Sequence, residues 1–530
     1  MFLTDYLGDE PENWEAGDWI FLKTPPGSGK TTFAQKFAIE KAREGKRVLF
    51  LSPRTILTEQ MMSDHLCLIA RTEEGMKSSL KNIHFFTYQA LEQRIKCRIS
   101  VPEYDVVIAD EAHYFLSDAA YNEATVISFN WLTAQRDSLI LFMSGTIDKF
   151  RTYIEENFQT QDPPQESAGK MRVTTSRHRI CYEYEMEADY TCYDVAYISD
   201  FDEIAEILAR SKGEKSVVFV SSKNRGERLE EKLRKHSIAA VFVNAQNKNT
   251  ITQKTVSNLV NVGCFREDVL IATSVLDVGV SIHDAAVGQI FIDTYDEVSF
   301  KQMLARVRIR GDEHRIKLFI SQQGITGFRE RCEQLQDKIH MYKTLVDVTE
   351  ENLPRKIAKL SLQEGFSPDA FNPVLTQYPH IRLNHLAGAQ FMFLYAEYVE
   401  IMKGLTDDPD FFLLRQLKWL GKEDEFDPDN FVSKEIEETR RKAFSELIEK
   451  KLPETENGIE FKQIQKVLKE LKEAARLLDR KRVRSNENLS VKNFNEVCKL
   501  YDLPFQIIQE EVARRQIYRI KKFADSGSVR

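Results

Sequence analysis

The sequence lacks the features that mark secreted proteins, membrane-spanning proteins and proteins with a structural metal site. Its seven cysteines lie far apart, with no C-x-x-C pair and no Cys/His cluster at zinc or iron–sulfur spacing. No stretch approaches the roughly 20 apolar residues that cross a bilayer, and the longest candidate, 386–396, contains Gln390 and is predicted to be a buried helix. The acidic N-terminus has no basic region before an apolar run. We therefore expect a cytoplasmic protein with free thiols and no structural metal.

The charge is unevenly distributed along a chain of otherwise ordinary composition. With 530 residues, 42% of them hydrophobic and 29% charged, the chain can bury a large core, which excludes disordered and fibrous classes. Residues 461–530 carry 17 Lys and Arg against 9 Asp and Glu, a net charge of +8, whereas the whole chain carries −8. The first 460 residues therefore carry −16. Such asymmetry is typical of a tail that faces nucleic acid, and equally of a solvated helical face.

Short apolar runs alternate with helical patterns in two successive blocks. The runs lie at 19–24, 47–52, 84–88, 105–110 and 139–144, and then at 217–222, 240–243, 268–274, 289–293 and 317–321. Continuous apolar runs indicate strands buried on both faces of a parallel sheet. We predict an α/β domain at 1–163, a second at 164–324 and an α-helical region at 325–530, basic from about 461. The break falls at the polar, Pro-containing stretch 161–170, and 171–198 is predicted to be extended.

A glycine-rich segment, TPPGSGKTT, follows the first apolar run and precedes a helical pattern. Backbone N–H groups at Gly27, Ser28 and Gly29 can cradle a phosphate at the N-terminus of the helix. Lys30 would reach the β- and γ-phosphates, and Thr31 would ligate Mg²⁺. The usual pattern begins with Gly, so the loop is a variant. The candidate nucleotide-binding residues here are Thr24, Pro25, Pro26, Gly27, Ser28, Gly29, Lys30, Thr31 and Thr32.

A pair of carboxylates follows a later strand, in the segment DVVIADEAH. After a buried strand and downstream of a phosphate loop, Asp110 is expected to hold Mg²⁺ and Glu111 to polarise the attacking water. Together the two segments predict a nucleoside triphosphatase.

From residue 24 to about 311 the chain resembles the superfamily 2 helicases and translocases of the DEAH-box type. TPPGSGKTT resembles motif I, DEAH (110–113) motif II and SGT (144–146) motif III. LSPRTIL (51–57), FTYQAL (86–91), VVFVSSK (217–223) and IATSVLDVGVSI (271–282) resemble motifs Ia, Ib, IV and V. The resemblance implies two tandem RecA-like domains, with ATP and Mg²⁺ as cofactors. It implies nucleic-acid contact or coupling for Pro53, Arg54, Thr87, Ser144, Thr146, Ser222 and Thr273, and nucleotide contact for Gly279.

The sixth motif and part of the fifth depart from the family pattern. QMLARVRIRG (302–311) keeps Gln302 and Arg306 at the family spacing, but Ile309 stands where the final Arg is expected, and Ser281 stands where Asp is common. The form resembles that of viral origin-binding and mobile-element helicases. An arginine is needed to stabilise charge on the γ-phosphate. The resemblance assigns this role to Arg306 and Arg308, with Arg310 as the alternate, and places Gln302 in the catalytic set.

We therefore expect an ATP-dependent helicase or translocase, acting on DNA more than on RNA. Two alternatives stay open: an ATPase that remodels protein–nucleic-acid complexes, and a nucleotide-gated scaffold that recruits a nuclease or replication partner. In the C-terminal region, RLLDRKRVR (476–484) is basic, and 490–522 is predicted to form two helices. These segments suit contact with nucleic acid or with a protein partner, and no membrane partner is expected.

Overall fold

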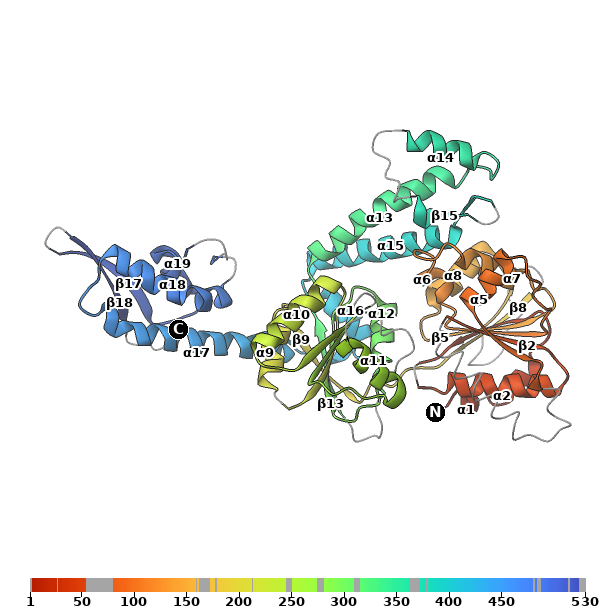
Figure 1. The fold of residues 1–530 in the computed structure, drawn as a ribbon, viewed down its shortest axis with the longest axis horizontal. Helices are drawn as coiled ribbons and strands as arrows, with labels where there is room; N and C mark the ends of the chain where they lie inside the picture. The colour runs from red at the N-terminus through yellow and green to blue at the C-terminus, as the bar shows by residue number, and fades with distance from the viewer. Residues whose placement is uncertain are drawn as a thin grey trace. The chain divides into compact units, whose positions relative to one another are not determined.

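The computed structural model places most of the chain. It describes residues 2–25, 27–53, 80–158, 160–161, 172–176, 179–211, 213–244, 250–273, 281–308, 315–362, 371–377, 380–479, 482–483, 488–512 and 515–523. Figure 1 shows the chain as a ribbon. It divides into two compact units, one of residues 2–195 and 211–427, the other of residues 196–210 and 428–523.

The first sheet has eight strands in the order β3-β2-β4-β5-β1-β8-β7-β6. Its strands are β1 (Trp19–Lys23), β2 (Val48–Ser52), β3 (Ile83–Thr87), β4 (Val106–Asp110), β5 (Leu139–Ser144), β6 (Thr160–Gln161), β7 (Arg172–Ser176) and β8 (Arg179–Glu185). The six strands from β3 to β8 are parallel, and β7 and β6 are antiparallel additions. Every residue of β2, β4 and β5 is buried, as the apolar runs predict.

Helices of the first lobe pack against this sheet. They are α1 (Leu3–Leu7), α2 (Lys30–Arg43), α5 (Tyr88–Lys96), α6 (Tyr114–Ser117), α7 (Thr125–Ala134) and α8 (Asp148–Asn157). Phe33 and Phe37 of α2 join Ile20 and Leu22 of β1 in one buried cluster. The phosphate loop therefore connects two elements that are fixed by the same core.

The first lobe extends further along the chain than expected, because strand β8 belongs to its sheet. The residues of β8 pair in parallel with β1, from Trp19 opposite Cys181 to Lys23 opposite Glu185. Residues up to Glu185 thus lie in the first sheet, beyond the boundary expected at 163/164. The expected extended conformation of 171–198 is confirmed by β7, β8 and β9 (Tyr193–Ile198).

The second sheet has six strands in the order β11-β12-β10-β13-β14-β9. Besides β9 they are β10 (Lys215–Phe219), β11 (Ala240–Val243), β12 (Val269–Ala272), β13 (Val287–Ile292) and β14 (Ile316–Ser321). The pairings from β11 to β14 are all parallel. The helices α10 (Lys223–Lys235), α11 (Thr250–Val262) and α12 (Glu297–Leu304) connect them. Two parallel sheets in tandem confirm the predicted RecA-like pair.

The chain after the second sheet is mainly helical, as predicted. The first unit continues through α13 (Ile325–Leu345), α14 (Leu353–Ser361), α15 (His385–Asp407) and α16 (Phe411–Trp419), with a short hairpin of β15 (Leu375–Thr376) and β16 (Arg382–Leu383). Helix α15 contains the apolar stretch predicted to be a buried helix, and Leu386, Ala387 and Phe391 are buried. None of the described helices is both long and apolar enough to cross a membrane.

The second unit contains one element from the middle of the chain and the C-terminal residues. Its elements are α9 (Glu203–Arg210), α17 (Ser433–Thr455), α18 (Phe461–Leu478), α19 (Val491–Leu500), β17 (Phe505–Val512) and β18 (Arg515–Lys522). The expected region 325–530 is therefore divided near residue 427.

The prediction of a second helix within 490–522 is wrong. This segment is an antiparallel hairpin in which Phe505 pairs with Lys522 and Val512 with Arg515. Phe505, Ile507, Tyr518 and Ile520 are buried at alternating positions. Alternation with a period of two places them on one face of a strand pair, and a helix would scatter them.

Candidate nucleotide site between two parallel sheets

The phosphate loop has the backbone conformation that its glycines allow. Gly27 and Gly29 have φ of 80° and 84°, in the left-handed region that other residues rarely adopt, and Gly29 precedes the first turn of α2. The Ser28 carbonyl accepts a hydrogen bond from Leu3 N–H (2.8 Å), so the first residue of α1 fixes the position of the loop backbone. The side-chain hydroxyls of Thr24 and Ser28 are buried without a hydrogen-bond partner among the described residues. A polar, glycine-lined loop of this kind fits a phosphate group.

Asp110 ends β4 and Glu111 follows it, at the edge of the sheet where β1 also ends, with β5 between the two strands. Asp110 is buried, and its Oδ1 accepts a hydrogen bond from Glu111 N–H (3.0 Å). Glu111 has a positive φ of 50°, an uncommon conformation for a residue with a side chain. Carboxylates are hard oxygen ligands that suit Mg²⁺, and Thr31 also lines this cavity.

His113, in the second motif segment, contacts residues of the third and sixth motif segments. Its Nδ1 lies 2.8 Å from Ser144 Oγ and 3.4 Å from Glu111 Oε2. Ser144 Oγ in turn accepts a hydrogen bond from Thr146 N–H (3.1 Å). On its other side, His113 Nε2 lies 2.5 Å from Gln302 Nε2, at the end of α12. Since the Gln302 amide is a donor, His113 accepts there and carries its proton on Nδ1.

Two arginines follow α12 and line the same cavity as the phosphate loop. Arg306 and Arg308 are held by a bridge in which Arg308 N–H donates to the Ile282 carbonyl (2.8 Å) and Ile282 N–H donates to the Arg306 carbonyl (2.7 Å). A Cβ added at Gly27 would lie 3.6 Å from Arg308 Nη1. Burial lowers the pKa of Arg308 from its usual range, and the nearby Glu111 carboxylate opposes this shift. Arg308 therefore brings positive charge beside the loop and Glu111.

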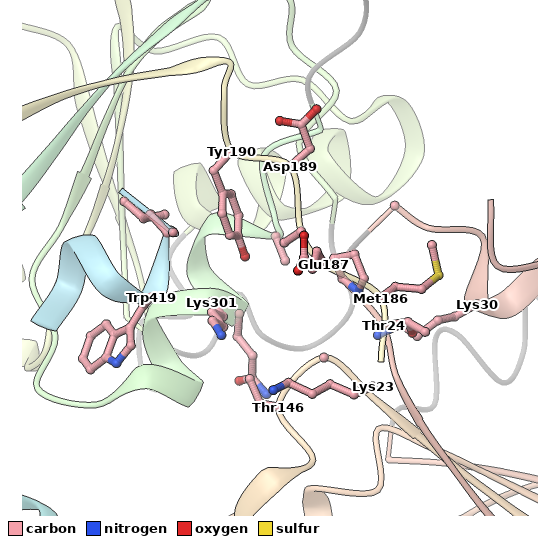
Figure 2. A pocket seen from close by; sticks show the side chains of 18 of the residues that line it. Lys23, Thr24, Lys30, Thr146, Met186, Glu187, Asp189, Tyr190, Lys301 and Trp419 are labelled. Atoms are coloured by element: carbon pink, nitrogen blue, oxygen red, sulfur yellow. The ribbon is translucent and has the colours of Figure 1, made fainter. Parts of the chain in front are cut away.

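One cavity of about 970 Å³ contains most of the predicted site residues. Thr24, Pro25, Gly27, Gly29, Lys30, Thr31, Thr32, Asp110, Glu111, Thr146, Gln302, Arg306 and Arg308 all line it. Ser281, the departure in the fifth motif, lines it too, while Ser28 lines an adjoining pocket. Figure 2 shows Thr24, Lys30 and Thr146 among the side chains around this space.

The same cavity has walls that the sequence motifs did not indicate. They comprise Phe2, Lys23, the 185–191 connection after β8, Lys301, and the 418–422 segment at the end of α16. Figure 2 shows Tyr190 and Trp419 on this side. Burial raises the pKa of Tyr190 to about 12, so its hydroxyl is a neutral hydrogen-bonding group. The only sequence signal for the connection was its predicted extended conformation, and none marked 418–422.

Lys23 at the end of β1 forms two ion pairs in the cavity wall. Its Nζ lies 2.7 Å from Glu185 and 3.0 Å from Asp148. Burial lowers the pKa of Lys23, but these two carboxylates raise it by more, so the net shift is upward. Lys23 therefore stays protonated and ties β1 to β8 and α8.

Four further predicted residues lie away from the cavity, after the carboxyl ends of parallel strands. Pro53 and Thr273 follow β2 and β12, while Thr87 ends β3 and Ser222 precedes α10. Thr87 Oγ1 and Ser222 Oγ accept hydrogen bonds from Ala90 N–H (3.0 Å) and Arg225 N–H (3.3 Å), which caps their helices. Pro26, Arg54, Gly279 and Arg310 lie outside the described residues.

A phosphate loop and paired acids on one parallel sheet, with arginines after another, define the nucleotide-binding core of a two-lobed P-loop protein. Residues 14–149 match the family described as "Type III restriction enzyme, res subunit", and residues 199–310 match "Helicase conserved C-terminal domain". Together the two matches indicate a superfamily 2 helicase core within residues 14–310.

Solved structures with a similar fold include S. cerevisiae Dbp5 bound to RNA and ADP BeF3, at 16% identity and a TM-score of 0.39, covering 57% of this chain and 78% of that one. Another is the Mycobacterium smegmatis helicase Lhr bound to ssDNA and AMP-PNP, at 15% identity and a TM-score of 0.39, covering 63% of this chain and 47% of that one. No curated protein matches the chain.

Proposed function

We propose that the protein is an ATP-dependent nucleic-acid helicase or translocase of the DEAH-box type, with DNA as its track more than RNA. The observation that carries the proposal is the single cavity that holds the phosphate loop, Asp110 and Glu111 from one sheet, and Arg306 and Arg308 from after the other. Such a composite site makes catalysis depend on how two lobes meet, which is how hydrolysis can drive a hinge motion.

Within this proposal the first lobe binds and orients the nucleotide. Lys30 and the loop N–H groups hold the phosphates, and Glu111 accepts a proton from the attacking water. Thr31 and Asp110 would hold Mg²⁺, which supplies positive charge to neutralise the phosphate oxygens. The buried Thr24 and Ser28 hydroxyls without partners offer further polar contacts for the nucleotide.

The second lobe completes the site. Arg306 and Arg308 stabilise the charge that develops on the transferring phosphoryl group, a contribution of about 10³–10⁵ in rate for arginines in this position. Gln302 positions His113 and thereby couples α12 to Ser144 and Thr146. The motif that contains these residues is similar to that of viral origin-binding helicases, and this similarity supports DNA over RNA.

The track is proposed to run along the carboxyl ends of the strands in both sheets. Pro53, Thr87, Ser222 and Thr273 lie after such strand ends and present hydroxyl or backbone groups suited to phosphate oxygens. Contacts of this kind fix the strand without reading its sequence. Binding should therefore tolerate any sequence and weaken as salt is raised.

Steady-state ATP hydrolysis tests the proposal. The protein is assayed alone and with single-stranded DNA, duplex DNA and single-stranded RNA, with Glu111→Gln as the blank. We expect one polymer to stimulate ATP hydrolysis strongly and the variant to abolish this stimulation. That polymer is then the nucleic acid along which the protein moves. Equal rates with every polymer, despite intact ATP binding, would refute a motor and favour the nucleotide-gated scaffold. Strand displacement on a forked duplex then separates unwinding from translocation alone.

A further inference from the structure

The second unit has the element order of a winged helix-turn-helix. Between α17 and α18, Ile459 forms a one-residue strand whose N–H donates to the Tyr518 carbonyl (3.0 Å) and whose carbonyl accepts from Tyr518 N–H (2.8 Å). The order is therefore helix, short strand, two helices and a hairpin, with Ile459 pairing on β18. Figure 1 shows α18 and α19 packed against the β17–β18 hairpin. A single buried cluster unites these elements.

Helix α19 is fixed rigidly on this scaffold. Ser490 caps its first turn by accepting a hydrogen bond from Asn493 N–H (3.1 Å). The Asn495 side chain accepts from Ile507 N–H (2.7 Å) and donates to the Ile507 carbonyl (3.0 Å), which ties the helix to β17. Tyr501 O–H donates to the Leu478 carbonyl (2.7 Å), which ties it to α18. A helix held on both sides presents its remaining face at a fixed angle.

That remaining face is exposed and carries lysines. Lys492, Glu496, Lys499 and Leu500 are spaced at i, i+4, i+7 and i+8, which is one side of a helix. The Lys492 side chain is 82% exposed and lies 3.9 Å from Glu496, a weak surface pair. Lys499 has no ion pair among the described residues. Arg515 is the first residue of β18; its side chain is 78% exposed and its Nη1 lies 3.6 Å from Glu460 Oε1, a second weak surface pair.

We propose that the second unit is a duplex-DNA-binding module, with α19 in the major groove and the β17–β18 strand pair against the adjacent backbone. In helix-turn-helix proteins the second helix of the pair enters the groove, and here that helix is α19. Residues 461–530, which contain α19 and the hairpin, carry +8 and complement a polyanion, while residues 196–210 and 428–460 in the same unit carry a net charge of −6. Exposed Leu500 offers an apolar contact of the kind that thymine methyl groups receive.

The geometry favours duplex DNA over duplex RNA and over a protein partner. The major groove of B-form DNA admits a helix, whereas the major groove of A-form RNA is deep and too narrow for side chains to read. A protein-binding face would be centred on aromatic anchors, and the α19 face offers lysines around one leucine. This inference does not depend on ATP hydrolysis by the other unit.

Fluorescence anisotropy with the full-length protein tests the assignment. A 20-bp labelled DNA duplex and an RNA duplex of the same sequence are titrated without nucleotide at about 50 mM salt. The variant is Lys492→Glu/Lys499→Glu. The matched control is Lys442→Glu/Lys450→Glu, which makes the same charge change at exposed positions of α17. We expect the first variant to weaken DNA binding at least about tenfold and the control to weaken it less than about twofold.

Unchanged melting temperature and unchanged basal ATP hydrolysis in both variants establish that neither change acts through folding. Equal losses in the two variants would identify general charge attraction and overturn the assignment. RNA duplex binding as tight as DNA binding, and equally sensitive to the α19 variant, would overturn insertion into the major groove. Duplex binding untouched by the α19 variant would leave this face to a protein partner and would overturn the proposal as well. Because binding is read without ATP, failure of the motor proposal leaves this result interpretable.

Discussion

Replacing Gln302 with alanine tests how the two sheets communicate. Gln302 Nε2 lies 2.5 Å from His113 Nε2, and His113 Nδ1 lies 2.8 Å from Ser144 Oγ. Truncation leaves a largely buried imidazole nitrogen without its donor from α12. An unsatisfied buried polar group costs about 1–3 kcal/mol, and about 1.4 kcal/mol corresponds to tenfold in rate. We therefore expect Gln302→Ala to lower kcat for ATP hydrolysis by about tenfold.

The affinity for ATP should change much less, by under about twofold, because the phosphate loop and Lys30 bind the ground state without this contact. The measurement is kcat and KM at saturating nucleic acid, together with equilibrium binding of a fluorescent ATP analogue. A double-mutant cycle with Ser144→Ala adds a sharper criterion. Both changes act through His113, so the double variant should lose less than the product of the two single losses.

Three results would contradict this reasoning. A kcat unchanged by Gln302→Ala would show that the contact to His113 has no part in turnover. A loss confined to KM would move Gln302 from coupling to simple nucleotide binding. Multiplicative losses in the Gln302/Ser144 cycle would show that His113 does not connect the two residues.

Further predictions concern the loop, the helical region and pH. Gly29→Ala should weaken ATP binding about fivefold to thirtyfold, since a φ of +84° costs about 1–2 kcal/mol for alanine. The added Cβ would lie 3.2 Å from Phe2, but this side chain is exposed and can move aside, so the backbone conformation is the main cost. An affinity for ATP equal to that of the unchanged protein would refute this. Gly388→Ala places a Cβ 2.2 Å from Tyr342 and should lower stability by about 1–3 kcal/mol in calorimetry, an unchanged melting temperature being the contrary result. Burial lowers the pKa of His385, so stability present above its ordinary pKa of 6.5 is lost as pH falls; His385→Gln should flatten that loss.

Apolar runs were sufficient to predict both sheets, because strands buried on both faces leave a continuous signal in the sequence. The phosphate loop and the Asp110–Glu111 pair were equally accessible, since each follows such a run and so falls at the carboxyl edge of a sheet. Arg306 and Arg308 line the same cavity as these segments. Residues that follow successive strands in the sequence could thus be predicted to lie close together, because the carboxyl ends of parallel strands meet at one edge of the sheet.

The errors arose where pairing depends on distant residues. The β8 segment joins the first sheet because β1 has a free edge, which no local pattern records. The 505–522 hairpin mixes charged and apolar residues, and its period-two burial is visible only once its buried face is known. Trp419 reaches the nucleotide cavity from a helix that follows both sheets, so no motif could have indicated it.

The charge distribution assigns different tasks to the two parts of the chain in binding a polyanion. The first 460 residues carry −16, so beyond the Debye length of about 8–10 Å they do not attract nucleic acid. In the proposed function their contacts with a track therefore act at short range, through hydrogen bonds from hydroxyls and backbone N–H groups at the strand ends and through individual basic side chains. Residues 461–530, at +8, supply the long-range attraction. Because α19 in the proposed module contacts the groove only after the encounter, reversing Lys492 and Lys499 should speed dissociation from duplex DNA more than it slows association. Stopped-flow measurement of both rate constants at two salt concentrations checks this, and a change confined to association would show that these two lysines act only by general charge attraction.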